Sequence, residues 1–135
     1  MTPEALFAGR QSLGLRENQE DSYGFCIFGS GPSAALLLAL ADGMGGHQRG
    51  EIASALAVKT FLERVDPQAA TPREAMLAAL EAANAEIGEE NRRHAGGPNE
   101  MGTTFVGAFL WKNHLQWVSV GDSPLYLYRD GELHT

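Results

Sequence analysis

One stretch limits the fold more than any other: the apolar run AALLLALA, from Ala34 to Ala41, which leads directly into Asp42 and Gly43. The run lacks the alternation of a half-buried strand, so it predicts a strand that is buried on both faces. It is far shorter than the roughly 20 residues that a membrane-spanning helix needs, and we expect no membrane association. The chain should therefore fold around a central strand that ends at an acidic residue.

The segments around this run predict further strands and two helices. Extended segments are expected over 6–14 and 21–28, with the turn sequence GSGPS separating the second of them from the central strand. After the run, apolar residues at helical spacing predict a helix over 50–65. A second helix begins with the cap Thr71, with Pro72 at its first position and Glu74 three residues after the cap. It should continue through Ile87 and fray within the polar stretch 89–100.

The last third of the sequence returns to strands. Segments 103–111 and 115–122 predict one hairpin, and segments 124–129 and 132–134 flank Asp130-Gly131, which favours a type I′ hairpin turn. Three strands, two helices and about four strands predict an α+β fold, an antiparallel β-sandwich with a packed helical pair. We expect a single domain over 1–135 that is incomplete, because both helices would cover one side and leave one sheet only partly covered.

Charge and cysteine content narrow the class of protein. The net charge of −7 and the pI near 5 argue against nucleic acid as a partner and suit a cation site better. Cys26 is the single cysteine, so no intramolecular disulfide can form, and its place within a strand predicts a core residue. The N-terminus lacks a basic region followed by a long apolar core. A cytoplasmic location is the resulting expectation.

The glycine-rich segment ADGMGGHQRGE, over 41–51, does not match a nucleotide-binding loop. A phosphate-binding loop needs Lys and then Ser or Thr after its last glycine, whereas His47, Gln48 and Arg49 stand here. The dinucleotide fingerprint needs three glycines at fixed spacing, and Gln48 occupies the third position. Either a metal site or a solvated turn remains compatible with this segment alone. For a metal site, Asp42 would supply a carboxylate and Gly43 a carbonyl oxygen, which suit Mg²⁺ or Mn²⁺.

Other carboxylates favour the metal site. Glu20 and Asp21 are adjacent at the start of a predicted strand, so their side chains should point to opposite faces. Arg16 lies just upstream, and a guanidinium can bind a phosphate with two hydrogen bonds. Asp122 ends another apolar strand, as Asp42 does. Together these residues indicate a hydrolytic metal site.

Four stretches in order carry a resemblance to a known family: RENQEDS, ADGMGGHQRGEIAS, MGTTFVGAFL and VGDSPLYLYRDGEL. The chain resembles the type 2C, or PPM, metal-dependent serine/threonine protein phosphatases, in their bacterial form. The resemblance implies a sandwich of two antiparallel sheets with a helical pair on each outer side. It also implies a centre with two Mn²⁺ or Mg²⁺ ions, a possible third ion, and a phosphorylated protein as substrate.

The same resemblance assigns roles to individual residues. Arg16 would hold the substrate phosphate, and Glu20 and Asp21 would bind metal or its waters. Asp42 would bridge two metals while Gly43 contributes its carbonyl oxygen. Asp122 matches the aspartate that bacterial relatives use for a third, more weakly held metal.

The sequence also departs from the family pattern. Two aspartates of the family, one in a Ser-Asp-Gly stretch and one in an Asp-Asn pair, have no counterpart in these 135 residues. We therefore expect a truncated form that is poorly active alone. The alternative is a non-catalytic phosphatase-like module that binds a phosphoprotein or a partner subunit. Self-association through the uncovered sheet is a further expectation.

Overall fold

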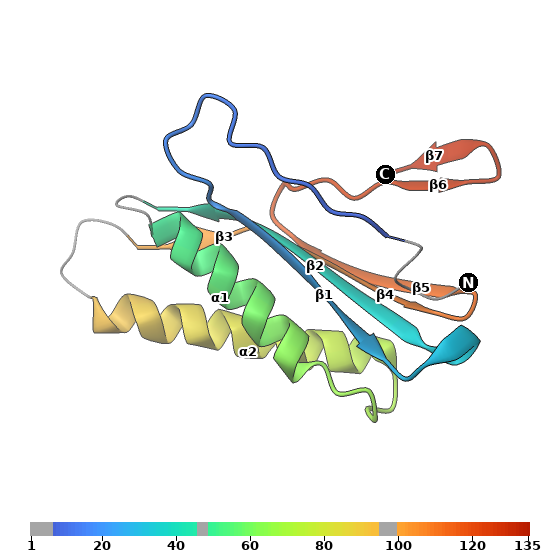
Figure 1. Cartoon of the computed structure of the whole chain (residues 1–135). Helices are drawn as coiled ribbons and strands as arrows, with labels where there is room; N and C mark the ends of the chain where they lie inside the picture. The colour runs from blue at the N-terminus through green and yellow to red at the C-terminus, as the bar shows by residue number, and fades with distance from the viewer. Residues whose placement is uncertain (1–6, 46–48, 95–99) are drawn as a thin grey trace.

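The computed structural model describes residues 7–45, 49–94 and 100–135. Figure 1 shows its strands and helices in chain order. They are β1 (Asp21–Phe28), the short 3-10 helix η2 (Gly31–Ser33), β2 (Ala35–Met44), α1 (Arg49–Arg64), α2 (Pro72–Arg93), β3 (Gly102–Thr103), β4 (Phe105–Trp111), β5 (His114–Val120), β6 (Leu127–Arg129) and β7 (Glu132–His134). Within the described ranges, neither helix is long and apolar enough to cross a membrane.

The strands form one antiparallel five-stranded sheet and one separate hairpin. The main sheet has the order β1-β2-β4-β5, with β3 paired to the end of β2, and among the described strands β6 pairs only with β7. Both long helices lie on one face of the main sheet (Figure 1). The prediction of an α+β fold, in which an antiparallel sheet packs with a helical pair, is therefore confirmed.

The core lies between the helices and one face of β2 and β4. Alternate residues of the apolar run, including Leu37 and Ala41, are fully buried on this face. Phe61 of α1 is also fully buried, and its ring centroid lies 4.6 Å from that of Phe105 on β4. Small residues of β2 leave room for α1 to lie close to the sheet, so this face gives the closely packed core expected of protein interiors.

The other face of the sheet keeps large apolar side chains in contact with solvent. Tyr23, Phe25, Leu40 and Trp117 are each between 42% and 51% exposed. The prediction that the apolar run is buried on both faces is therefore wrong, because Leu40 of that run lies on this open side. The chain before β1 and the β6–β7 hairpin lie on this side (Figure 1). Phe7 packs on Phe25 with ring centroids 4.5 Å apart, but this cover is partial.

One predicted strand is absent from the residues that the structure describes, whereas the predicted end of the second helix is confirmed. The described part of segment 6–14 is not a strand, because it ends in a turn where the Arg16 amide donates to the Leu13 carbonyl and Gly14 has a φ of 61°. Helix α2 ends at Arg93, which lies within the polar stretch 89–100 where the sequence predicts that it frays. Ion pairs one turn apart, between Glu89 and Arg92 and between Glu90 and Arg93, line this last part of the helix.

Candidate metal centre

The strand register brings two predicted carboxylates together. Asp21 of β1 pairs directly with Asp42 of β2, at the end of the sheet where β2 leads into α1. Partial burial raises the pKa of Asp21, and so do a hydrogen bond to the Asp42 side chain and the negative charge of Asp42. The Arg16 guanidinium lowers this pKa, and Glu20 raises it further. The two carboxyl groups thus form a close pair of like charge, which a bound cation would stabilise.

A contact between two glycines holds the end of β2 against the start of α1. A Cβ atom on Gly43 would lie 1.8 Å from the carbonyl oxygen of Gly50, so no larger residue fits without movement of the backbone. The Gly43 amide donates to the Glu20 carbonyl at 3.0 Å. A Cβ on Gly50 would lie 3.0 Å from Cδ of Glu20, which places the Glu20 side chain against α1. Glu20 and Asp21 therefore point in different directions at the strand start, as the alternation predicted.

Arg16 lies close enough to the carboxylate pair for its charge to act on Asp21. Its backbone forms the turn that precedes β1, and its side chain is exposed. An exposed guanidinium beside a site of hard oxygen ligands can bind a phosphate group that reaches that site.

Asp122 follows β5 and is exposed. The neighbouring Ser123 links this loop to the end of β2 through Thr104, which lies just before β4. The Ser123 hydroxyl lies 2.5 Å from the Thr104 hydroxyl, and Thr104 in turn bonds the backbone of Asp42. The loop that carries Asp122 is thus attached to the segment that faces Asp42.

The donor set suits a hard divalent cation but is partial. Asp21 and Asp42 offer carboxylate oxygens, and Gly43 offers a backbone carbonyl, which are the ligands that Mg²⁺ and Mn²⁺ prefer. Among residues 7–45, 49–94 and 100–135, no group of three or more His, Cys, Asp or Glu side chains is close enough to hold a metal. Gly46, His47 and Gln48 of the glycine-rich segment lie outside the described residues.

Sequence reasoning missed two residues that shape this centre. Gly50 was not recognised because nothing in the sequence indicated that its backbone touches Gly43. Thr104 is only 5% exposed, although it is polar and lies just before the apolar strand β4. A single polar residue next to an apolar strand was the available signal, because a buried hydroxyl needs a hydrogen-bond partner.

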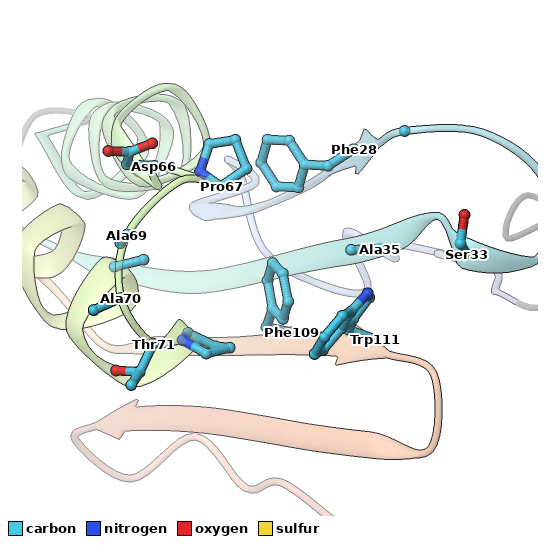
Figure 2. A pocket seen from close by; sticks show the side chains of 13 residues that line it. Phe28, Ser33, Ala35, Asp66, Pro67, Ala69, Ala70, Thr71, Phe109 and Trp111 are labelled. Atoms are coloured by element: carbon cyan, nitrogen blue, oxygen red, sulfur yellow. The ribbon is translucent and has the colours of Figure 1, made fainter.

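A pocket of about 380 Å³ lies at the opposite end of the sheet from the carboxylates. Phe28, Phe109 and Trp111 line it from the strands, and the connection between α1 and α2 closes its other side (Figure 2). Along β2, Ala35 of this pocket is about 23 Å from Asp42, at the usual rise of a strand. Its one carboxylate, Asp66, accepts a hydrogen bond from the Gln68 amide at 2.8 Å. The pocket is therefore separate from the candidate metal centre.

Comparison with known proteins supports the family resemblance that the four ordered sequence motifs indicate. The family model described as protein phosphatase 2C matches residues 8–135. The chain is 40% identical over 129 residues to the serine/threonine protein phosphatase PstP of Mycobacterium tuberculosis (strain H37Rv), covering 94% of this chain and 23% of PstP. It is 33% identical over 128 residues to the serine/threonine phosphatase stp of Listeria welshimeri, covering 88% of this chain and 48% of stp.

Solved structures share the fold. A crystal structure of the catalytic domain of PstP in complex with two manganese ions superposes with a TM-score of 0.71 at 37% identity, over 88% of this chain and 48% of that one. The Streptococcus agalactiae serine/threonine phosphatase gives a TM-score of 0.70 at 30% identity, over 88% and 49%. The chain thus spans about half the length of the phosphatase chains in these structures. Since the family model matches almost the whole sequence, the chain belongs to the protein phosphatase 2C family.

Proposed function

We propose that this chain carries part of the active site of a metal-dependent protein serine/threonine phosphatase. The observation that carries the proposal is the close pair Asp21 and Asp42, whose like charges meet at the end of β1 and β2. Membership of the protein phosphatase 2C family supports it, as does the similarity to a relative whose structure contains two manganese ions. The substrate class we propose is a protein phosphorylated on serine or threonine.

In this proposal the chain holds two Mn²⁺ or Mg²⁺ ions jointly with residues outside these 135. Asp42 would bridge the ions, and the Gly43 carbonyl, Glu20 and Asp21 would bind metal or its waters. Such ions lower the pKa of a bound water and stabilise charge on a transferring phosphoryl group. Asp122 would contribute to a third, more weakly held ion. The rigid contact between Gly43 and Gly50 keeps the carbonyl and carboxylate of this strand end in place.

Arg16 is proposed to bind and orient the phosphate of the substrate. Its guanidinium offers several N–H donors in one plane, which match two phosphate oxygens. Because it also lies near Asp21, its positive charge would offset the repulsion between the carboxylates and an incoming phosphate.

We propose that the chain alone is poorly active. It covers 48% of the PstP catalytic domain, and its described residues do not form a complete set of metal ligands. A hybrid in which the remaining part of that domain follows Thr135 should hydrolyse a phosphothreonine peptide in the presence of Mn²⁺. The separate chain should show little turnover under the same conditions. Rapid turnover by the chain alone would overturn this part of the proposal.

The substitution D42N in the hybrid tests the metal role directly. It should abolish Mn²⁺-dependent hydrolysis and weaken Mn²⁺ binding, because an amide oxygen cannot replace the charge of a carboxylate. The matched control is D130N, which makes the same change in the exposed β6–β7 turn. Undiminished activity of D42N, with D130N equally active, would refute the assignment.

The alternative is a non-catalytic module that binds a phosphoprotein or a partner subunit. The observation that favours it is that the donor set is incomplete among the residues that the structure describes. The gene sequence after Thr135 separates the two proposals. A continuation into Ser-Asp-Gly and Asp-Asn stretches supports the enzyme, and a stop codon supports the module.

We also propose that the exposed apolar face allows a second copy to pair with the first, since large apolar side chains lie there in solvent.

We further propose that the protein is located in the cytoplasm. The free thiol of Cys26 is compatible with a reducing compartment, and fractionation of cells would test the location.

A further inference from the structure

Thr104 lies between the end of strand β2, which carries Asp42, and the loop that carries Asp122. It lies between β3 and β4 and is 5% exposed. Its hydroxyl accepts a hydrogen bond from the Asp42 amide at 3.2 Å, and its own amide donates to the Asp42 carbonyl at 2.9 Å. Both backbone polar groups of Asp42 are therefore held by one residue.

The same hydroxyl reaches the loop that carries Asp122. It lies 2.5 Å from the Ser123 hydroxyl, with either group able to donate. A hydroxyl has one proton and two acceptor positions, so Thr104 can accept from Asp42 and still bond Ser123. The Thr104 side chain therefore forms a direct link between the backbone of Asp42 and the residue next to Asp122.

The methyl group of Thr104 makes a second contact with the loop that carries Asp122. Gly121 has a φ of 94°, and a Cβ at this position would lie 2.9 Å from the Thr104 Cγ2. The loop thus packs closely on the methyl group while Ser123 bonds the hydroxyl. Serine at position 104 would keep the hydroxyl and lose the methyl, and valine would keep the shape and lose the hydroxyl. The two contacts can therefore be separated by substitution.

We propose that Thr104 is a positioning residue that couples Asp42 to the Asp122 loop, so that the two acidic groups are set in place as one unit. The inference rests on the proposed function for the roles of Asp42 and Asp122. Its structural part stands on the hydrogen bonds of the described residues. Loss of the hydroxyl should free the Asp42 amide and the Ser123 side chain together.

The experiment compares T104V, T104S and S123A in the 135-residue chain, with T60V as the matched control. Thr60 is 7% exposed and lies on α1, away from Asp42 and from the Asp122 loop, so T60V makes the same change at a buried site elsewhere. Hydrogen exchange measured by NMR reports on each amide in the metal-free chain, and titration with Mn²⁺ alone reports on metal affinity.

In T104V we expect exchange of the Asp42 amide to become roughly tenfold faster, as for the loss of one hydrogen bond. Exchange at Asp122 and Ser123 should rise as well, and Mn²⁺ should bind several-fold more weakly. T104S should restore the Asp42 amide to wild-type protection. The Asp122 amide should exchange no faster in the double variant T104V/S123A than in T104V, because both substitutions remove the same hydrogen bond.

The coupling is overturned if T104V changes the exchange at Asp42 and Ser123 no more than T60V does. It is also overturned if T104S behaves as T104V, since that result would assign the effect to packing of the methyl group. Failure of the proposed function has a different signature: neither the wild-type chain nor the hybrid would bind Mn²⁺, and the hybrid would not hydrolyse the phosphothreonine peptide. In that case the exchange rates still decide whether Thr104 couples Asp42 to the Asp122 loop.

Discussion

The two faces of the main sheet differ although both are rich in apolar residues. On the helix side, Leu37 and Phe61 are fully buried between β2 and α1. On the other side, Phe25 and Trp117 are each 51% exposed, and the cover from the chain before β1 is partial. The apolar character of a strand therefore does not reveal which of its faces is packed. We therefore expect packing on the helix side to contribute most of the free energy of folding. The other side keeps apolar surface that a further layer or a partner could cover.

The largest test of this difference is a pair of phenylalanine truncations. F61A should lower the free energy of unfolding by about 3–5 kcal/mol, because it leaves a cavity beside Phe105. F25A removes the same group from a half-exposed site and should cost less than about 1 kcal/mol, since surface changes have small effects. Urea unfolding monitored by circular dichroism measures both. Equal losses of unfolding free energy in F61A and F25A would mean that the two faces contribute equally to stability.

The second test concerns the helix side where it reaches the carboxylates. G43A should lower the free energy of unfolding by about 1–3 kcal/mol, because its methyl group would displace the Gly50 carbonyl. G102A is the matched control, since a Cβ there would meet only the Met44 side chain, at 3.6 Å. G43A should also weaken Mn²⁺ binding, measured by titration, and G102A should leave it unchanged. A stable G43A variant would show that the strand end can move.

The third test addresses the exposed face. If a second copy covers it, F25D should raise the dimer dissociation constant at least tenfold, which is about 1.4 kcal/mol. Y128D places the same acidic residue at an exposed aromatic on the separate β6–β7 hairpin and serves as the control. Sedimentation velocity over a range of concentrations measures the change. A wild-type chain that stays monomeric throughout would exclude self-association.

The smallest expected effect comes from the carboxylate pair. The pKa of Asp21 is raised in the fold above its ordinary value of 3.8, chiefly by burial and then by Asp42. The folded chain thus holds this proton more tightly than the unfolded chain, so this contribution to stability is present below pH 3.8 and is lost as the pH rises through the folded pKa.

D21N should therefore stabilise the metal-free chain near pH 7 by roughly 0.5 kcal/mol, after allowance for solvent screening. The gain should disappear below pH 3.8, where the carboxyl group is protonated in both states. Thermal unfolding in the presence of EDTA, near pH 7 and below pH 3.8, measures this gain in stability. A loss of stability in D21N near pH 7 would contradict the assignment of repulsion to this pair.

Much of the fold followed from local patterns in the sequence. The run before Asp42 predicted β2, and helical spacing predicted α1 over 50–65, close to its observed range Arg49–Arg64. The Thr71 cap was also correct, since its hydroxyl accepts from the Glu74 amide at 3.1 Å. These features depend on neighbours in the chain, which is why sequence reasoning could reach them.

What the sequence did not reveal depends on contacts between distant residues. The pairing of Asp21 with Asp42 needs the register of β1 on β2, and register is set by packing of the whole face. The attachment of the end of α2 to the chain just before β3 depends on Asn91, whose side chain bonds both backbone groups of Met101 at 2.9 Å. The roles of Arg16, Glu20 and Asp122 came from the family resemblance, and substitution experiments are needed to test them.

The contact between Gly43 and Gly50 has a consequence for how this family can diverge. A side chain at either position is excluded by the backbone of the other, so no compensating mutation of the partner can accept it. Selection should therefore act on the two glycines as one inherited pair, since a side chain at either position is blocked whatever residue stands at the other.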